Sequence, residues 1–331
     1  MNKKTIAVVM GGYSNEYFIS LESAQLIYES LDRNLYTVYR VAILKNGWYF
    51  LDNDGRRYPI NKEDFSVTLE NNKKLKFDIC FNTIHGIPGE NGVIQNYWDS
   101  IEQKYTGCSS YQSALTFNKK DTLAVLGEYG IQSAKSFYLR KGEKINVDTI
   151  VEHLGLPLIV KPNQSGSSFG ISKVKEKPEL VIAIEKAFQE SDDVLIQHFL
   201  NGTEISVGVV NFKGETIVLG ITEIVHKNDF FDYQAKYEGA SEEITPARIN
   251  ETIKKRVEET AKIAYEALGM RGFSRSEYIL ADGNIYMLEM NTTPAFTPTS
   301  VFPQQAIRYG ITLKNLCGSQ VEDVIMKKQI S

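Results

Sequence analysis

The chain has 331 residues, of which 42% are hydrophobic and 24% charged, a composition typical of a soluble globular protein with two or three packed domains. Its formal net charge of −4 argues against the basic surface by which proteins bind nucleic acid. No apolar run approaches the length that spans a bilayer, and the first one, 6–10, stops at Gly11-Gly12 without a signal-peptide cleavage pattern. We therefore expect neither a nucleic-acid partner nor a membrane segment.

The cysteines are odd in number and lack the spacing of metal ligands (Cys80, Cys108 and Cys317). This usage predicts buried or incidental thiols in a reducing compartment. We expect a cytoplasmic protein.

Strand and helix signals alternate through the first third of the chain. A β-branched apolar run, 5–10, is followed by a helix at 19–31 and by strands at 38–44 and 77–84. Such alternation predicts a parallel α/β sheet. Two short runs around the turn Asn53-Asp54-Gly55 indicate an inserted hairpin.

Two polar segments follow strands of this predicted sheet, where ligands of α/β proteins bind. Glu16 follows the first strand and could meet a substrate ammonium, or it could complement the dipole of the helix that starts there. His85 follows the strand 77–84 and is either a site residue or a loop histidine that satisfies backbone carbonyls. Local sequence leaves both alternatives open.

The middle block contains helices at 118–129, 147–154 and 178–190, with strands at 136–139, 158–161 and 171–174. Between the last two strands lies Lys161-Pro-Asn-Gln-Ser-Gly-Ser-Ser-Phe-Gly170. Backbone N–H groups of such a loop can surround phosphate oxygens, although the Walker spacing is missing. An ordinary mobile loop is the alternative interpretation.

The last block begins with predicted strands at 194–198, 204–210 and 216–219. The poorly patterned stretch 226–246 follows, and structureless segments of this length are often functional lids. Lys236 could reach a terminal phosphate from such a lid and Tyr237 could bond a substrate, whereas an exposed loop is the competing interpretation. A helix at 251–268 ends at Gly269.

The segment 273–291 reads as two strands joined by a tight Asp282-Gly283-Asn284 turn. Residues two apart on a strand share a face, so the hairpin can gather four polar side chains, those of Arg275, Glu277, Glu289 and Asn291. Two carboxylates beside an amide oxygen suit Mg²⁺, which also retains water and phosphate oxygens as ligands. A solvated hairpin face is the alternative.

The order of these motifs resembles that of the D-alanine–D-alanine ligases of the ATP-grasp superfamily over almost the whole chain, and most closely those of the Bacteroidetes branch. The segments that carry the resemblance are Gly11-Gly-Tyr-Ser-Asn-Glu16, His85-Gly-Ile-Pro-Gly-Glu-Asn-Gly92, Tyr105-Thr-Gly107, Ala114-Leu-Thr-Phe-Asn-Lys119, Val160-Lys-Pro162 through Gly166-Ser-Ser-Phe-Gly170, Phe231-Asp-Tyr-Gln-Ala-Lys-Tyr237, Thr245-Pro-Ala247 and Leu288-Glu-Met-Asn-Thr-Thr-Pro294.

The resemblance implies an ATP-grasp fold preceded by an N-terminal parallel α/β domain. We expect a substrate domain at 1–117, a central ATP-grasp subdomain at 118–200, and a C-terminal subdomain at 201–331 that contains the lid 226–246 and the metal hairpin 273–291. ATP would phosphorylate one D-alanine to an acylphosphate, which the amino group of a second D-alanine would attack. A homodimer is also implied.

The resemblance assigns one set of residues to the nucleotide and its metal ions. The phosphates would be held or covered by Lys119, Lys161, Ser168 and Lys236. The base would meet the strand end that contains Gln197, His198 and Leu200, and the ribose would meet Glu204. Two Mg²⁺ ions, which Mn²⁺ could replace, would be bound by Glu277, Glu289 and Asn291.

A second set is assigned to the amino acids. Glu16 would pair with the first D-alanine ammonium and would form a hydrogen-bonded group with Ser167 and Tyr237. His85 would lie beside the same substrate. The oxyanion would be stabilised by Arg275 and by the backbone at Ala295. The carboxylate of the second substrate would be received at Ser300 and Val301.

The chain departs from the family pattern at four places. The common Glu-Arg-Glu-Val-Ser signature is here Glu16-Tyr-Phe-Ile-Ser20, and Glu277 stands where many members have aspartate. Gln197 replaces a frequent glutamate, and the usual Pro-Gly is Pro294-Ala295 followed by Phe296. Alanine retains the N–H group but restricts the backbone angles, so the oxyanion geometry could differ.

Two rival functions remain from the sequence. One is a ligase that joins D-alanine to D-lactate, D-serine or another amino acid, although Tyr237 favours the dipeptide product. The other is a nucleotide-binding paralogue with weakened turnover, which the changes after Glu16 and at Ala295-Phe296 motivate. Retention of every charged group assigned to phosphate or metal argues against the second rival.

Overall fold

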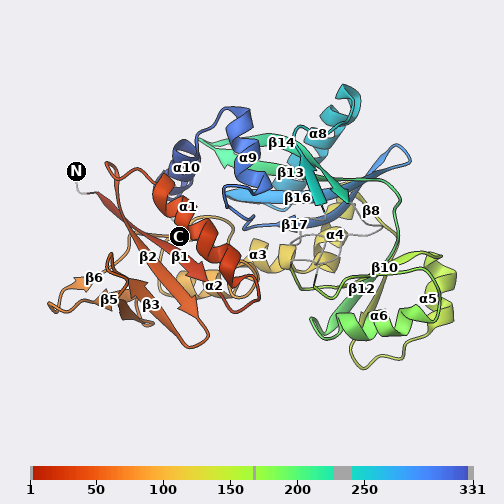
Figure 1. The fold of residues 1–331 in the computed structure, drawn as a ribbon, viewed down its shortest axis with the longest axis horizontal. Coiled ribbons are helices and arrows are strands. Elements are labelled where there is room, and N and C mark those ends of the chain that lie inside the picture. Colours follow the sequence, from red (N-terminus) through yellow and green to blue (C-terminus); the bar gives the residue numbers. More distant parts are fainter. Residues whose placement is uncertain (1–2, 167–168, 227–240, 327–331) are drawn as a thin grey trace.

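The computed structural model describes residues 3–166, 169–226 and 241–326. In these ranges the strands form three sheets, of seven, four and six strands. Figure 1 shows the seven-stranded sheet at the left, the six-stranded sheet at the upper right and the four-stranded sheet at the lower right. Every helix in the described ranges is too short or too polar to cross a membrane.

The N-terminal sheet has the strand order β6-β5-β4-β3-β2-β1-β7. Strand β1 pairs in parallel with β2 and β7, which confirms the predicted parallel sheet for these three strands. The other strands form an antiparallel extension, in which β3 and β4 are the predicted hairpin. The strands are Lys4–Gly11 (β1), Tyr36–Leu44 (β2), Gly47–Leu51 (β3), Arg57–Asn61 (β4), Ser66–Thr68 (β5), Lys74–Leu75 (β6) and Ile79–Asn82 (β7).

Both faces of β1 are buried, because alternate residues of a strand point to opposite sides. Ile6 and Val8 pack on one face with helix α1 (Tyr17–Ser30). Ala7 and Val9 pack on the other face, in a cluster that contains Phe65, Phe77 and Trp98. Helix α2 (Val93–Ser100) supplies Trp98, and helix α3 (Ser110–Phe117) follows it.

The central sheet has the order β11-β10-β12-β9 and carries helices on one face only. Leu158 and Val160 of β10 pack there with Leu180 and Ile184 of α6, so Lys161 points to the opposite face. The elements are Ser136–Arg140 (β9), Val147–Leu154 (α5), Leu158–Pro162 (β10), Ser172–Val174 (β11), Glu179–Ala187 (α6) and Asp193–His198 (β12).

The third sheet has the order β15-β14-β13-β16-β17-β8. Its strands are Gln132–Ser133 (β8), Thr203–Phe212 (β13), Glu215–His226 (β14), Ser241–Ile244 (β15), Phe273–Ala281 (β16) and Asn284–Asn291 (β17). Leu123 and Leu126 of α4 (Lys119–Glu128) pack in the same core as Ile205 and Val207. Helix α4 and strand β8 therefore belong structurally with this sheet, and the boundaries at 117 and 200 stay predictions.

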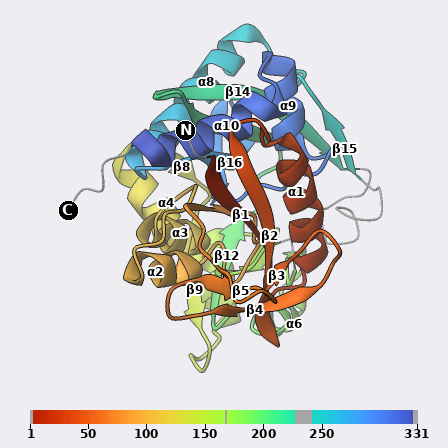
Figure 2. The same ribbon diagram turned by 90° about the vertical axis from the view of Figure 1, so that its left-hand side faces the viewer.

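The described residues of the C-terminal part also form the helices Glu251–Ala267 (α8), Val301–Tyr309 (α9) and Leu313–Met326 (α10). Asn250 caps α8, where its side chain accepts a hydrogen bond from Ile253 N at 2.9 Å. Helices α9 and α10 lie over the six-stranded sheet, and α10 packs beside α1 (Figures 1 and 2). Phe302 of α9 and Leu316 of α10 share one apolar core with Ile6 and Val8, so the first and last parts of the chain pack together.

The predicted unpatterned stretch 226–246 differs from the structure at its C-terminal end. Residues Ser241–Ile244 form β15, which pairs antiparallel with β14. The segment Ser-Glu-Glu-Ile has little apolar alternation, so its strand conformation depends on backbone pairing at a sheet edge rather than on side-chain pattern. Residues 227–240 lie outside the described part of the chain.

Candidate active site

The hairpin β16–β17 places its polar residues directly opposite one another. Arg275 pairs with Asn291, and Glu277 with Glu289. The turn places Asp282 at φ 49° and Gly283 at φ 75°, the left-handed angles of a tight hairpin turn. A bulge follows Glu277. The bulge shifts the register by one residue, so that Glu277 lies opposite Glu289 rather than Leu288, and two carboxylates, an amide and a guanidinium come together.

Two lysines from other elements approach these carboxylates. Lys119, at the start of α4, lies 3.2 Å from Glu289 Oε2 and donates to Ser165 O at 2.7 Å. Lys161 of β10 is buried, and burial lowers the pKa of its ammonium to about 8 even though Glu289 and Glu277 raise it. A site that removes lysines from water and surrounds them with carboxylates suits a polyanionic ligand.

Arg275 is the third cation of the site and is partly buried. Its guanidinium lies 2.7 Å from Glu277 Oε1, and its Nε is buried and has no partner among the described residues. Burial lowers the pKa of Arg275, but nearby carboxylates, led by Glu277 and Glu289, outweigh burial and raise it. The unused Nε donor can therefore bond to a developing negative charge on a substrate.

The donor set of the hairpin fits Mg²⁺. Within the described ranges no group of three or more histidine, cysteine or acidic residues forms a metal cluster, and the hairpin offers only two carboxylates with the amide of Asn291. Mg²⁺ typically takes one or two protein carboxylates together with phosphate and water oxygens. Asn291 Oδ1 accepts from Thr293 N at 2.8 Å and retains a second lone pair.

Glu16 lies where the loop after β10 meets the loop after β7. A methyl group on Gly166 would lie 2.7 Å from Glu16 Oε2, and one on Gly86 would lie 3.2 Å from it. The glycines therefore let two backbones approach this carboxylate closely. Four predicted site residues lie outside the described part of the chain, namely Ser167, Ser168, Lys236 and Tyr237.

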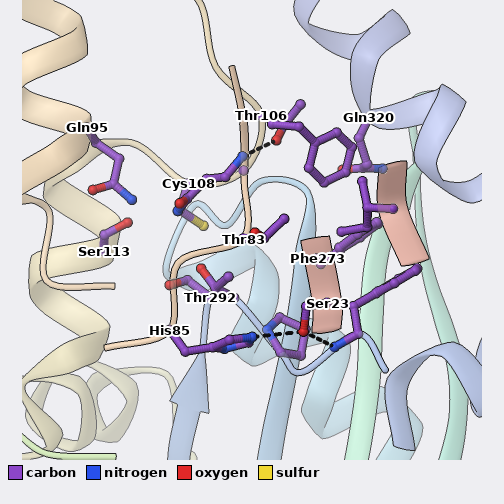
Figure 3. A pocket seen from close by; sticks show the side chains of 17 residues that line it. Ser23, Thr83, His85, Gln95, Thr106, Cys108, Ser113, Phe273, Thr292 and Gln320 are labelled. Atoms are coloured by element: carbon purple, nitrogen blue, oxygen red, sulfur yellow. Dashed lines mark hydrogen bonds between the residues drawn. The ribbon is translucent and has the colours of Figure 1, made fainter. Parts of the chain in front are cut away.

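His85 is buried beside helix α1. Its Nε2 lies 3.1 Å from Ser23 Oγ, and its backbone carbonyl accepts from Ser14 Oγ at 3.0 Å. Figure 3 shows His85 and Ser23 pointing toward one another across the pocket. His85 thus lines the pocket of Figure 3 together with Thr292, and it also supports the loop. Its assignment to the substrate stays a prediction.

The residues that the resemblance assigns to the base and ribose lie at the end of β12 and at the start of β13. Gln197 is buried and donates from Nε2 to Ser136 Oγ at 3.0 Å. The N–H of His198 is already bonded to Lys135 O at 3.0 Å, while Leu200 follows the strand. Glu204 lies near the start of β13, and its charge acts on Lys161. Gln197 therefore shares the face of Lys161, whereas the His198 ring turns toward α5, where its Nδ1 lies 3.0 Å from Leu154 O. The assignment of these residues to the nucleotide stays a prediction.

Family models match both halves of this architecture. The model for the D-Ala–D-Ala ligase N-terminus matches residues 5–108, and the model for the D-Ala–D-Ala ligase C-terminus matches residues 125–322. The chain belongs to the D-alanine–D-alanine ligase family. The ATP-grasp fold and the preceding α/β domain that the sequence predicted are thereby confirmed.

Individual relatives agree with this membership. The chain is 55% identical to a D-alanine–D-alanine ligase of Flavobacterium johnsoniae, over 96% of this chain and 98% of the relative. Among solved structures, a D-Ala:D-Ser ligase (VanG) of Enterococcus faecalis is 31% identical with a TM-score of 0.88, covering 98% of this chain and all of the other. A D-alanyl-alanine synthetase A of Vibrio cholerae is 27% identical with a TM-score of 0.89, covering 99% and 100%. The expected similarity to ligases of the Bacteroidetes branch is confirmed.

The segment after the hairpin contains the most consequential departure from the family pattern. Non-glycine residues with positive φ in the described ranges do not include Ala295, so alanine fits here without left-handed strain. Phe296 is buried and stacks on Phe273, with ring centroids 5.4 Å apart. Phe296 therefore fills the core between the two ends of the chain, while Ala295 is half-buried beside it. The Ala295-Phe296 change thus gives no structural motive for a weakened paralogue.

Helix α9 begins where this segment ends. Ser300 precedes the helix, and its Oγ accepts from Thr297 N at 3.1 Å and lies 2.7 Å from Thr297 Oγ1. Val301 is the first helical residue and is buried. A helix N-terminus offers free backbone N–H groups to a carboxylate, so the geometry suits the assignment of both residues.

Sequence reasoning missed Glu90. Its carboxylate accepts from Gly86 N at 2.6 Å, and burial, together with the charge of Glu16, raises the pKa of Glu90 to about 8. It borders a cavity with Lys119, Glu289 and Asn291. The sequence did contain a signal for Glu90. In the segment His85-Gly-Ile-Pro-Gly-Glu90, which follows a predicted strand, an acidic residue stands directly after a glycine-containing loop.

Proposed function

We propose that this chain joins two D-alanine molecules to the D-alanyl-D-alanine dipeptide of peptidoglycan, with ATP as the energy source and ADP and phosphate as products. The observation that carries the proposal is the charged hairpin, in which Glu277 faces Glu289 across the strands while Lys119 and Arg275 pair with these carboxylates. The lysine and arginine of such a set, with the divalent ions that its carboxylates would hold, would neutralise a transferring phosphoryl group. Family membership supplies the reaction type.

Residues of the central and C-terminal sheets bind the nucleotide in this proposal. Lys119 and Lys161 hold the phosphates, Ser168 covers them, and Lys236 meets the transferred group. Gln197, His198 and Leu200 border the base, and Glu204 accepts the ribose hydroxyls. Glu277, Glu289 and Asn291 hold two Mg²⁺ ions, which Mn²⁺ can replace, and the ions add positive charge against the phosphates.

Residues of the N-terminal domain orient the amino acids. Glu16 binds the ammonium of the first D-alanine, supported by Ser167 and Tyr237, and His85 lies beside its carboxylate. Arg275 and the N–H of Ala295 stabilise the oxyanion as the second amino group attacks the acylphosphate. Ser300 and Val301 receive the carboxylate of the second D-alanine. Holding both substrates in one geometry supplies much of the rate enhancement.

A second candidate is a ligase with another second substrate. The observation that favours it is the TM-score of 0.88 with a D-Ala:D-Ser ligase, since the fold alone does not distinguish the two products. Tyr237 lies outside the described residues, so its sequence argument for the dipeptide remains a prediction.

Phosphate release measured over a panel of D-amino and D-hydroxy acids tests the proposal. We expect release that requires ATP, a divalent ion and D-alanine, with the dipeptide identified by mass spectrometry in equal amount. Preferential use of D-serine or D-lactate as second substrate at neutral pH would select the other ligase. Absence of D-alanine-dependent release with any divalent ion would refute a ligase function.

We further propose that the enzyme is a cytoplasmic homodimer. The motive is the family and the three buried, unbridged cysteines, which suit a reducing compartment. Light scattering at micromolar concentration should give twice the chain mass of 37.4 kDa. A mass near that of one chain would refute the dimer.

A further inference from the structure

The hydroxyl of Ser23 joins three segments that are far apart in the sequence. Ser23 lies in the middle of α1, and its Oγ is 3.1 Å from His85 Nε2 in the loop after β7. The same oxygen accepts a hydrogen bond of 2.9 Å from Phe296 N, which follows the hairpin β16–β17. Figure 3 shows both bonds as dashed lines that meet at Ser23.

All three groups are removed from solvent. Ser23 is 1% exposed, His85 3% and Phe296 1%. A buried hydroxyl that fails to donate its proton, or a buried N–H without an acceptor, destabilises the folded protein. Each hydrogen at this junction therefore needs an acceptor within the protein.

The number of hydrogen atoms at this junction determines which group donates and which group accepts in each hydrogen bond. The Phe296 N–H can only donate, so it occupies one lone pair of Ser23 Oγ. The hydroxyl has a single proton, and His85 Nε2 is the other group in contact with it. If Nε2 carried a hydrogen, Ser23 would receive two hydrogens and have no acceptor for its own. Nε2 is therefore the acceptor.

We propose that Ser23 is a positioning residue that holds His85 as its Nδ1–H tautomer and fixes the imidazole to the backbone of Phe296. The rest of the loop supports the same orientation, because Ser14 Oγ bonds to the His85 carbonyl at 3.0 Å and Glu90 bonds to Gly86 N at 2.6 Å. The catalytic consequence rests on the proposed function, in which His85 and the neighbouring Ala295 contact the first D-alanine. Ser23 itself touches no substrate.

The tautomer can be measured without any assay of activity. The chain has 4 histidines, so ¹⁵N spectra of histidine-labelled protein at a pH where the ring is neutral will contain few signals, and His85→Gln will assign the one of interest. We expect a pyrrole-type Nδ1 and a pyridine-type Nε2 for His85 in the unmodified protein. The opposite pattern would overturn the proposal whether or not Ser23→Ala folds.

Ser23→Ala tests whether the hydroxyl sets this pattern. We expect the His85 signals of the variant to move toward the Nε2–H tautomer. Ser113→Ala is the matched control, because Ser113 is also a fully buried serine that borders the same pocket, but its hydroxyl has no hydrogen-bond partner among the described residues. Unchanged His85 signals in Ser23→Ala, or equal changes in both variants, would refute the role of Ser23.

Kinetics then test the consequence for the substrate. We expect Ser23→Ala to raise KM for D-alanine about tenfold, the value of one hydrogen bond, while KM for ATP stays within about twofold. Ser23→Thr, which retains the hydroxyl, should restore most of the loss. A parallel rise in both KM values, or no rescue by threonine, would indicate a structural role only. A protein without D-alanine-dependent activity would refute the proposed function while leaving the tautomer measurement valid.

Discussion

Two clusters of charged side chains in this molecule differ in what shifts their pKa values: ion pairing in one and burial in the other. Near strands β5 and β6, Asp64 lies 2.8 Å from Lys74 Nζ and 3.3 Å from Lys76 Nζ, with both lysines half exposed. The Lys74 ammonium, with help from Ser66, holds the pKa of Asp64 well below its usual range. At the hairpin β16–β17, burial opposes charge instead: it lowers the pKa of Lys161 to about 8 and raises the pKa of Glu90 to about 8.

This difference in the pKa values distinguishes two kinds of charged cluster. In one, the charged side chains pair only with one another, and in the other they are arranged to bind a ligand. The Asp64 cluster is complete in itself, because each charge has a partner and water around it. The hairpin cluster gathers carboxylates and cations in a buried place at a cost in stability. A nucleotide phosphate with divalent ions would complete it, so we expect the two clusters to respond differently to substitution.

The largest expected effect is at Glu289. Glu289→Gln should lower turnover about 10²–10³-fold, because it removes a carboxylate that would hold a divalent ion, and that ion would neutralise charge on the transferring phosphoryl group. Unfolding free energy should change by no more than about 1 kcal/mol, since the residue is partly exposed and its pair with Lys119 is only one interaction. Steady-state phosphate release and thermal unfolding measure the two quantities. Near-normal turnover would contradict the metal assignment.

Glu90 should dominate the pH dependence of stability. Its pKa is about 8 in the folded protein against an ordinary value of 4.5, so the folded state retains a proton that the unfolded state releases. Stability should therefore fall as the pH rises from about 4.5 to 8. Glu90→Gln should remove this loss, on the order of 3 kcal/mol, in denaturant titrations of the ligand-free protein at pH 5 and 8.5. If the unfolding free energy depended on pH equally in both proteins, the raised pKa of Glu90 would be contradicted.

Lys161 should show a trade-off between stability and binding. Its ammonium is buried, so Lys161→Met should stabilise the ligand-free protein by about 2 kcal/mol at pH 7. The advantage should decline as the pH rises above about 8 toward 10.5, where the native lysine loses its proton in both states. Calorimetry should show at least about tenfold weaker ATP binding by the variant. Unchanged ATP affinity would exclude Lys161 from the phosphate site.

The smallest effect is expected in the solvated cluster. Asp64→Asn should cost less than about 1 kcal/mol at pH 7, because the paired lysines are half exposed. Since the pKa of Asp64 is depressed, its contribution is present above about pH 4 and disappears as the pH falls. Turnover should be unchanged, so this variant is also the control for Glu289→Gln. A loss of turnover would remove the contrast between the clusters.

The sequence predicted contacts that depend on the alternation of residues along a strand. Strand alternation predicted that Glu277 and Glu289 could come together on one face of the hairpin. The register set by the tight turn would pair Glu277 with Leu288, and the bulge after Glu277 brings it opposite Glu289 instead. Contacts that depend on tertiary packing were not predictable. The bond from Phe296 to Ser23 joins residues 273 positions apart, and no local pattern specifies such a partner.

Two weaker signals were present but could not be interpreted from the sequence. Glu16, Ser20 and Ser23 recur at the spacing of one helix face, which is compatible with either a polar surface or a site. Strand β15 has no apolar alternation and forms through backbone pairing with β14. In both places the deciding interaction comes from a distant part of the chain.

Counting divalent ions tests most directly whether the hairpin cluster is built for a metal–nucleotide complex. Electron paramagnetic resonance of Mn²⁺, titrated into the protein with a non-hydrolysable ATP analogue, gives the number of ions bound per chain. We predict two ions in the unmodified protein and in Asp64→Asn, and a weakened or missing ion in Glu289→Gln. Identical Mn²⁺ binding by Glu289→Gln and the unmodified protein would contradict the account.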